Sequence, residues 1–275
     1  MRPRRPIGLF DSGIGGLSIW QAVTHLLPAE ATRYFADSAY CPYGPRPLEE
    51  VRARSAIIGR FLLEQDCKLI VVACNTASAA ALESLRAEFE IPIIGLEPAI
   101  KPAAQATRTG HIGVLATAGT FQGALFQHTR QRYANGVQVH VRIGAGLVEQ
   151  VEAGQFDAPA TEALLRQYLE PMLSAGVDQL ALGCTHYLLL MPLIEHIVAG
   201  QATVLDPAQA VARQVQRILN QTVGLPDWDA TATPLESQHL FFTSGHPQLL
   251  QNLTSTLAGL DVPPVQVALD KMAPY

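Results

Sequence analysis

Residues 69–78 read Leu-Ile-Val-Val-Ala-Cys-Asn-Thr-Ala-Ser, and the interpretation of the rest of the chain follows from them. The apolar, β-branched start is typical of a strand buried on both faces. The Ala-rich run at residues 77–85 predicts a helix capped by Asn75 or Thr76. Cys74 is therefore expected where a strand ends and a helix begins. Ligands bind at that edge of an open α/β sheet, and a helix N-terminus there favours a thiolate.

A second stretch, residues 179–190, repeats this design. Gln-Leu-Ala-Leu-Gly leads into Cys184, Thr185 and His186, and then into Tyr-Leu-Leu-Leu. A single cysteine in an apolar run is usually a small buried hydrophobe. Packing alone does not require polar capping residues after both cysteines, so the matched pair favours a functional role for the two thiols.

Landmarks of the first half of the chain recur in the same order in the second half, at an offset of about 105–110 residues, which predicts an internal duplication. The matching pairs are residues 7–13 with 111–119, Cys74 with Cys184, and residues 96–99 with 205–208. Strands alternate with helices in each half, an order that predicts parallel sheets with right-handed crossovers. We expect an α/β protein of two similar domains, each a mainly parallel sheet flanked by helices, with the active site in the cleft between them.

Two acid–proline pairs, Glu97-Pro98 and Asp206-Pro207, predict where the chain crosses between the domains. Residues 1–97 plus 208–275 would form the first domain, and residues 98–207 the second. The alternative is one contiguous domain up to residue 208 and a small C-terminal one. The expected strands are 6–10, 32–36, 91–95, 137–141 and 239–243, the expected helices are 48–64, 209–220 and one from 246, and residues 224–236 are an expected loop.

Composition narrows the function classes. The 275 residues are 48% hydrophobic and 16% charged, which is typical of a globular α/β protein. The net charge of −5 and the lack of a basic face argue against nucleic acid as the main partner. We expect no membrane span and no export signal, because no apolar stretch is long enough. Cys41, Cys67, Cys74 and Cys184 form no disulfide framework, so free thiols in a reducing cytosol are expected.

The sequence gives no sign of a cofactor or a metal. Its three lysines, Lys68, Lys101 and Lys271, lie in no recognisable Schiff-base context, which argues against pyridoxal phosphate. The glycines at 13–16 do not satisfy the dinucleotide pattern GxGxxG. No cluster of histidine, cysteine and aspartate has metal-ligand spacing. A pair of thiols working without a cofactor remains.

Two thiols on opposite sides of a cleft suit a reaction that removes a proton from one face of a carbon and returns it to the other, which is racemisation or epimerisation. Such a thiol needs neighbours that tune its pKa. Asp11, at the end of the first strand, is the candidate beside Cys74. The repeat places Ala116 at the corresponding position, so His186 and Glu152 would serve Cys184. Taken singly, Asp11 could be a helix cap, His186 a helix N-terminal histidine and Glu152 a solvated residue.

Polar side chains at the predicted strand ends form a ring of hydroxyl and amide donors suited to carboxylate oxygens, although each could be only a cap. These residues are Ser12, Asn75, Thr76, Thr117, Thr120 and Thr185. The loop at residues 40–47, with three prolines and a glycine, is stiff and would either wall the site or remain a plain surface loop.

The chain resembles the glutamate racemases of the cofactor-independent aspartate/glutamate racemase group. The resemblance rests on residues 10–17, 42–44, 72–78, 116–120 and 182–187. It implies interconversion of L- and D-glutamate, supplying D-glutamate for peptidoglycan in the bacterial cytoplasm, by a homodimer. Cys74 would handle the proton of the D-isomer with support from Asp11, and Cys184 that of the L-isomer with support from Glu152 and His186.

The same resemblance implies a set of substrate-binding residues: Asp11, Ser12, Pro42, Tyr43, Gly44, Asn75, Thr76, Thr117, Thr120, Thr185 and His186. Two positions depart from the family pattern, which usually has proline at Leu188 and an aliphatic residue at Cys41; Cys41 would add an oxidisable thiol near the cleft. Two other functions stay open, a related cysteine-pair racemase acting on aspartate or a hydantoin, and a binding protein that regulates a partner on the same fold.

Overall fold

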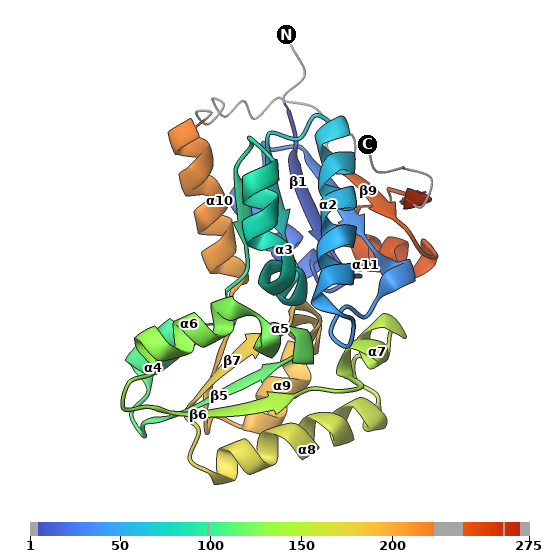
Figure 1. Cartoon of the computed structure of the whole chain (residues 1–275). Coiled ribbons are helices and arrows are strands. Elements are labelled where there is room, and N and C mark those ends of the chain that lie inside the picture. The colour runs from blue at the N-terminus through green and yellow to red at the C-terminus, as the bar shows by residue number, and fades with distance from the viewer. Residues whose placement is uncertain (1–4, 98, 223–238, 261, 270–275) are drawn as a thin grey trace.

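The protein, seen here as a computed structural model, is built on two parallel sheets (Figure 1). The structure describes residues 5–97, 99–222, 239–260 and 262–269. Within these residues the first sheet has six strands in the order β10-β9-β2-β1-β3-β4. The strands are β1 (Ile7–Asp11), β2 (Thr32–Ala36), β3 (Leu69–Val72), β4 (Ile93–Gly95), β9 (His239–Thr243) and β10 (Val265–Gln266).

The second sheet has four strands among the described residues, in the order β6-β5-β7-β8. They are β5 (His111–Ala116), β6 (Gln138–Ile143), β7 (Gln179–Gly183) and β8 (Thr203–Leu205). Counted along each half of the chain, four strands of both sheets have the order second-first-third-fourth: β2-β1-β3-β4 in the first sheet and β6-β5-β7-β8 in the second. Every pairing between the described strands is parallel. This agreement supports the duplication that the repeated landmarks predict.

Helices flank both sheets (Figure 1). Around the first sheet they are α1 (Leu17–Leu26), α2 (Leu48–Glu64), α3 (Asn75–Glu88), α10 (Ala208–Thr222) and α11 (Gln248–Ala258). Around the second they are α4 (Ile100–Ala106), α5 (Ala118–Gln122), α6 (Ala124–Tyr133), α7 (Leu147–Glu152), α8 (Pro159–Ser174) and α9 (Met191–Val198). Two 3₁₀ turns, η1 (Ser38–Tyr40) and η2 (Thr185–Leu190), complete the described elements.

The apolar residues of the central strands explain why these sheets form. All residues of β1, β3 and β7 are buried, because helices cover both faces of a parallel sheet. The largest core cluster continues from the first sheet to the second, from Ile7 and Trp20 to Leu182 and Tyr187. This shared core brings the carboxyl ends of the central strands of the two sheets together.

Most predicted elements are confirmed to within a few residues, with four differences. The strand expected at 91–95 is shorter and that at 137–141 is displaced, the C-terminal helix begins at Gln248, and the short edge strand β10 was not predicted. Strands β9 and β10 extend the first sheet beyond β2, so the C-terminal region returns to it. The exact domain limits stay a prediction, and the loop expected at 224–236 lies outside the described residues.

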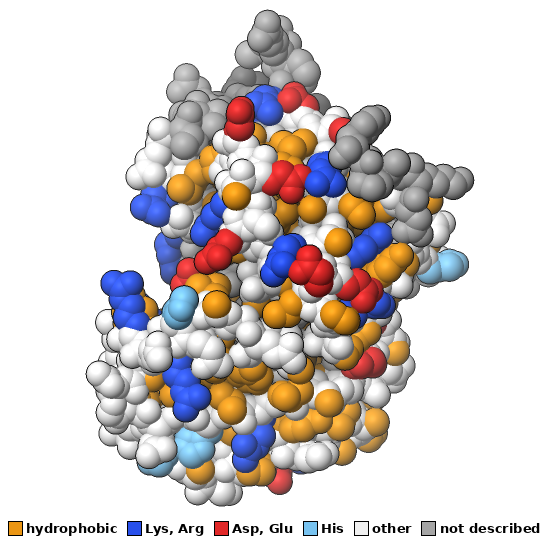
Figure 2. All heavy atoms as spheres, in the orientation of Figure 1, with side chains coloured by type: hydrophobic (Ala, Val, Ile, Leu, Met, Phe, Trp, Pro, Cys, Tyr) orange, Lys and Arg blue, Asp and Glu red, His pale blue; other side chains and the backbone are white. Residues whose placement is uncertain are grey.

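The surface shows no concentration of one charge on the face in Figure 2, where basic and acidic side chains are interspersed. Among the described residues, no helix combines the length and the apolar character that crossing a membrane requires.

Candidate active site

Cys74 follows β3 and is itself the N-cap of α3, a role predicted for Asn75 or Thr76. Its Sγ accepts a hydrogen bond from the Ala77 backbone N–H at 3.5 Å and donates one to Ser12 Oγ at 3.8 Å. Burial raises the pKa of Cys74 well above its ordinary value, and the charge of Asp11 adds to the rise. The N–H of Ala77 at the start of α3 lowers the pKa of Cys74, in the direction predicted for a helix N-terminus, but desolvation outweighs this contribution.

Asp11 ends β1, and its carboxylate is fully buried beside Cys74. Its Oδ1 accepts the backbone N–H of Ser12 at 2.8 Å, and its Oδ2 accepts that of Gly16 at 2.6 Å. Thr185, from the second sheet, donates its hydroxyl to the same Oδ2 at 3.3 Å. Burial raises the pKa of Asp11, although the charge of His186 and these hydrogen bonds oppose the rise. A carboxyl group with a raised pKa next to a thiol can exchange a proton with it.

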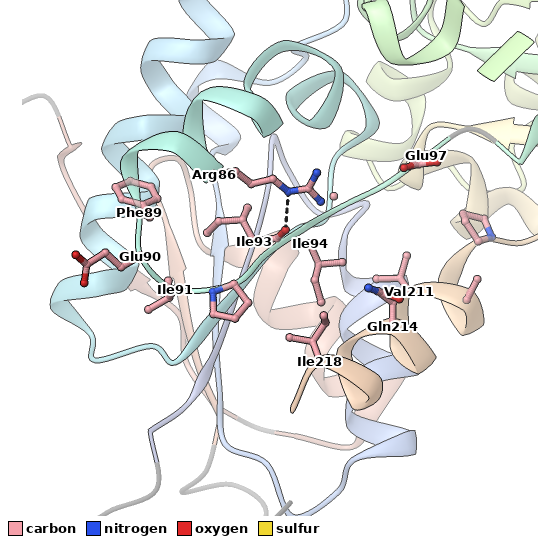
Figure 3. Close-up of a pocket in the computed structure, with 14 residues that line it drawn as sticks. Arg86, Phe89, Glu90, Ile91, Ile93, Ile94, Glu97, Val211, Gln214 and Ile218 are labelled. Carbon is pink, nitrogen blue, oxygen red and sulfur yellow. Dashed lines mark hydrogen bonds between the residues drawn. The ribbon is translucent and has the colours of Figure 1, made fainter. Parts of the chain in front are cut away.

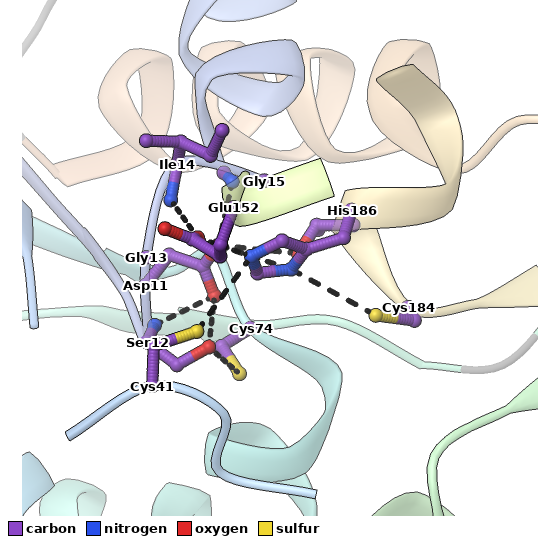
Figure 4. A network of polar contacts seen from close by, with 12 residues as sticks. Asp11, Ser12, Gly13, Ile14, Gly15, Cys41, Cys74, Glu152, Cys184 and His186 are labelled. Atoms are coloured by element: carbon purple, nitrogen blue, oxygen red, sulfur yellow. Dashed lines mark hydrogen bonds and ion pairs between the residues drawn. The ribbon is translucent and has the colours of Figure 1, made fainter. Parts of the chain in front are cut away.

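Cys184 follows β7 as the N-cap residue of η2, and its partner His186 lies within η2, the 3₁₀ turn that precedes α9. Cys184 Sγ is 3.9 Å from His186 Nδ1, and His186 Nε2 donates to Glu152 Oε1 at 2.7 Å (Figure 4). Burial alone would lower the pKa of His186, but its hydrogen bonds with Cys184, Cys41 and Glu152 raise it well above the ordinary value. An imidazolium ion beside a sulfur atom stabilises negative charge on that sulfur.

Glu152 ends α7 in the second domain, and the first domain holds its carboxylate in place. The backbone N–H of Ile14 donates to Glu152 Oε1 at 2.8 Å. Burial would raise the pKa of Glu152, but the hydrogen bond and charge of His186, with the Ile14 N–H, lower it. Glu152 is thus an anion that binds Nε2 of His186 and orients the ring so that Nδ1 faces Cys184. The prediction that His186 and Glu152 replace the missing carboxylate at Ala116 agrees with this geometry.

One cavity brings most of the predicted residues together. Its free volume is about 10 Å³, roughly the space that one water molecule needs, so its walls must separate to admit an amino acid. The predicted residues that line it are Ser12, Pro42, Tyr43, Gly44, Cys74, Asn75, Thr76, Thr117, Cys184, Thr185 and His186. Asp11, Glu152 and Thr120 are not among the lining residues. Each of the three is hydrogen-bonded to a residue that does line the cavity. Asp11 accepts from Thr185, Glu152 accepts from His186, and Thr120 bonds to Thr117.

Some polar side chains around the cavity are hydrogen-bonded within the protein, and one has a donor group without a partner. Thr76 and Thr117, from opposite domains, join their hydroxyl groups at 2.8 Å, and Thr117 contacts Thr120 at 2.9 Å. The Tyr43 hydroxyl is bound to Asp37, so Tyr43 does not offer this group to a ligand. The side-chain N–H₂ of Asn75 is buried and has no hydrogen-bond partner. A buried donor without a partner costs free energy, which a carboxylate oxygen would recover.

Two cavity neighbours were not predicted as site residues. Val148, in α7, lines the cavity, and its apolar side chain gave no signal in the sequence. Cys41 was noted only as a thiol near the cleft, yet its Sγ is 3.9 Å from His186 Nε2. The three donor atoms of Cys41, Glu152 and His186 lie within 4.8 Å of one another. Sequence spacing could not show this cluster, because the three residues are far apart along the chain.

A larger cavity of about 720 Å³ lies between α3, β4 and α10 (Figure 3). Arg86 crosses it and donates from Nε to the carbonyl of Ile93 at 3.1 Å. None of the predicted site residues lines this cavity, which has no cysteine or histidine in its wall. The thiol chemistry therefore belongs to the small cavity between the sheets.

Comparison with known proteins decides the family. The sequence profile of the Asp/Glu/Hydantoin racemases matches residues 11–215, from Asp11 to the middle of α10. The chain belongs to this racemase family. Among curated relatives of this racemase, glutamate racemase of Ectopseudomonas mendocina is 46% identical over 255 residues, which cover 92% of this chain and 95% of the relative. Glutamate racemase of a Roseiflexus species is 47% identical over 254 residues, covering 92% of each chain.

Solved racemase structures share the fold described above. A glutamate racemase isoform of Bacillus anthracis superposes with a TM-score of 0.83 at 32% identity, covering 96% of this racemase and 97% of that chain. The Escherichia coli glutamate racemase, solved with L-glutamate and the activator UDP-MurNAc-Ala, gives a TM-score of 0.83 at 31% identity, with 96% and 99% coverage. The two-domain α/β architecture is therefore that of these racemases.

Proposed function

We propose that this chain interconverts L- and D-glutamate, with Cys74 and Cys184 as the two acid–base groups. The observation that carries the proposal is that both thiols line one small cavity, each from a different sheet. The glutamate racemases named above, at 46% and 47% identity, support glutamate as the substrate.

In the proposed reaction, the Cys74 thiolate removes the α-proton of D-glutamate while the Cys184 thiol protonates the opposite face. For L-glutamate the roles reverse, so each turnover needs one thiolate and one thiol. Asp11 serves Cys74 as the group that takes up or returns its proton. His186, oriented by Glu152, stabilises charge on Cys184 and resupplies its proton.

The polar ring would hold the substrate between the thiols. We assign the unpartnered N–H₂ of Asn75 to a substrate carboxylate, together with the hydroxyl groups of Ser12, Thr76 and Thr185. Pro42 and Gly44, with the Tyr43 side chain held by Asp37, would form a further part of the wall around the substrate. Thr117 would contribute to the wall from the second domain, and Thr120 would hold the Thr117 hydroxyl in place.

The reaction as proposed uses no cofactor and no metal. Lys68 is paired with Glu30 and buried, and the Lys101 ammonium lies over the Tyr133 ring in α6, so neither of these described lysines reaches the cavity to form a Schiff base with a substrate. We also propose that the protein acts as a homodimer in the cytoplasm and supplies D-glutamate to peptidoglycan. Sedimentation of the purified protein near 59 kDa, twice its chain mass of 29.6 kDa, would support the dimer.

The test is circular dichroism of L-glutamate incubated with purified protein, a strong chelator and no pyridoxal phosphate. The signal should decay to zero as the racemate forms. Aspartate and a hydantoin serve as parallel substrates, since the family profile includes enzymes for both. A faster rate on either one would reassign the substrate. Lack of activity on all three, with partner binding retained in Cys74→Ala, would favour a regulatory protein.

A further inference from the structure

Beside the racemase cavity lies a set of side chains with the chemistry of a metal site, which the proposed reaction does not need. Cys41 supplies a thiol, His186 an imidazole and Glu152 a carboxylate, and their donor atoms lie within 4.8 Å of one another. Thiolate, imidazole and carboxylate together are the ligands that Zn²⁺ takes in proteins. Figure 4 shows Cys41 and Glu152 on the same side of the His186 ring, both near Nε2, with Cys184 on the opposite side.

The distances fit a tetrahedral ion after small movements. Ordinary Zn–S, Zn–N and Zn–O bonds place sulfur and nitrogen about 3.6 Å apart, and nitrogen and oxygen about 3.4 Å apart. Cys41 Sγ is 3.9 Å from His186 Nε2, and Glu152 Oε1 is 2.7 Å from the same nitrogen. The thiol therefore has to approach by a few tenths of an ångström and the carboxylate to withdraw by somewhat more. Glu152 is only partly buried, which leaves its carboxylate room to move.

The surroundings of the cluster match those of metal ligands. A ligating histidine usually directs its other ring nitrogen to a carboxylate, and a ligating carboxylate usually accepts a further hydrogen bond. Glu152 Oε1 accepts the N–H of Ile14, and His186 Nδ1 has the Asp11 carboxylate nearby at 4.0 Å, beyond hydrogen-bond distance. Gly13 packs against the cluster, where a Cβ would lie 1.9 Å from Glu152 Oε1 and 3.1 Å from Cys41 Sγ. The absence of that Cβ leaves the space between the thiol and the carboxylate open.

We infer that Cys41, Glu152 and His186 form an inhibitory site for a thiol-seeking divalent cation such as Zn²⁺. The ion binds Cys41 as thiolate, His186 through Nε2 and Glu152 through its carboxylate, and it displaces the Cys41 thiol proton and the His186 Nε2 proton to solvent. His186 then loses its bond to Glu152 and keeps its remaining proton on Nδ1. It can no longer take up a proton from Cys184, so racemisation stops in both directions.

This inhibition rests on the proposed function, whereas binding of the metal does not, so each has its own measurement. The first titrates buffered Zn²⁺ against glutamate racemisation by wild type, Cys41→Ala and Cys67→Ala. Cys67 is a matched control, because it is a buried free thiol that does not belong to the cluster. Wild type and Cys67→Ala should be inhibited alike and recover with chelator, while Cys41→Ala, compared with its own zinc-free rate, should need at least about tenfold more zinc for the same fractional inhibition. Equal zinc sensitivity of Cys41→Ala would overturn the site and point to Cys74 or Cys184.

The second measurement uses Co²⁺ as a spectroscopic substitute for zinc and needs no activity. Wild type should bind one equivalent with a near-ultraviolet cobalt–thiolate charge-transfer band, and Cys41→Ala should lack that band. A band that persists in Cys41→Ala, or cobalt bound without any band in wild type, would refute the site even if racemisation is confirmed. Cys41→Ser takes the place of Cys41→Ala if the alanine variant does not fold. A protein that shows the band but has no racemase activity would refute the proposed function instead.

Discussion

At the scale of single residues, the two thiols have different partners. Cys74 lies beside Asp11, and burial with the negative charge of Asp11 raises the pKa of the thiol. Cys184 faces the positive charge of His186, which Glu152 holds in place. The cavity is therefore asymmetric in charge although the two sheets repeat one topology. That asymmetry suits a substrate whose carbon carries different groups on its two sides.

The raised pKa of Cys74 predicts how activity depends on pH. At neutral pH this group is mostly thiol, and the thiolate that acts as base becomes more abundant as pH rises. We expect kcat/KM for D-glutamate to increase from neutral to alkaline pH. Asp11→Asn removes a negative charge that raises the pKa of Cys74, so the pH–rate curve of this variant should begin to rise at lower pH than that of wild type. Its kcat should fall, because the carboxylate that exchanges a proton with Cys74 is lost. A pH–rate series on both proteins checks this, and an unshifted profile in Asp11→Asn would contradict it.

Removing the imidazole of His186 should slow the step on the Cys184 side. Because the two enantiomers have equal free energy, kcat/KM of His186→Asn must fall equally in both directions, by about 10²-fold or more. The primary isotope effect with α-deuterated glutamate shows which face is affected. With L-glutamate, whose proton Cys184 removes, the isotope effect of His186→Asn should be larger than that of wild type. With D-glutamate it should be smaller. The reverse pattern would exchange the roles of the two cysteines.

At the scale of elements, the turn between β1 and α1 joins the two domains. A Cβ on Gly15 would lie 2.5 Å from both the backbone nitrogen and the Nδ1 of His186. Backbone cannot move away as cheaply as the end of a side chain, so only glycine lets α1 approach η2 this closely. Gly13, which faces Glu152, and Gly15 thus serve close packing of the two domains at the site.

Gly15→Ala should therefore impair catalysis and stability together. We expect a loss of about 1–3 kcal/mol of unfolding free energy, typical of overpacking, and a larger relative loss of kcat because His186 shifts. Gly113→Ala is the matched control, since its Cβ would meet only side-chain atoms of Leu180, Met172 and Val177, each at 3.1 Å. It should be destabilised but keep most of its kcat. Comparable kcat in the two variants would argue against close packing at Gly15.

The elements were largely predictable because their signals are local. The apolar runs before Cys74 and Cys184 predict buried strands, and both strands are confirmed. The N-cap was misassigned because the Cys74 sulfur takes the position that a hydroxyl or amide usually holds. The neighbours of the site were less predictable. Val148 lines the cavity although nothing in its immediate sequence indicates this. Cys41 was expected near the cleft, but its contact with His186 arises only from packing of the two domains.

At the scale of the whole molecule, the cavity exists only because two sheets meet at their carboxyl ends. The Cys74 and Cys184 side chains are almost completely buried there, and the hydroxyl groups of Thr76 and Thr117 meet across the two domains. We therefore expect access to either thiol to require separation of the two domains, and glutamate to enter by the same route.

This closure predicts slow and protectable alkylation. Iodoacetamide should modify Cys41, which is partly exposed, faster than Cys74 or Cys184. Bound glutamate should slow modification of the two buried thiols further, because it occupies the cavity between the domains. Mass spectrometry of digests over time gives each rate. Full modification of Cys74 and Cys184 with unchanged activity would rule out both as catalytic groups.

The central claim is that Cys74 and Cys184 act on opposite faces of one carbon, and single cysteine variants in deuterated water test it most directly. In Cys184→Ala, D-glutamate should exchange its α-proton for deuterium through Cys74 without inverting, and L-glutamate should neither exchange nor invert. Cys74→Ala should show the mirror image. Proton NMR of the α-position reports exchange, and chiral chromatography reports inversion. The identity of the enantiomer that exchanges is the test, and it can be read even if the rates are low. Interconversion of the enantiomers at near wild-type speed by either variant would contradict the two-thiol account.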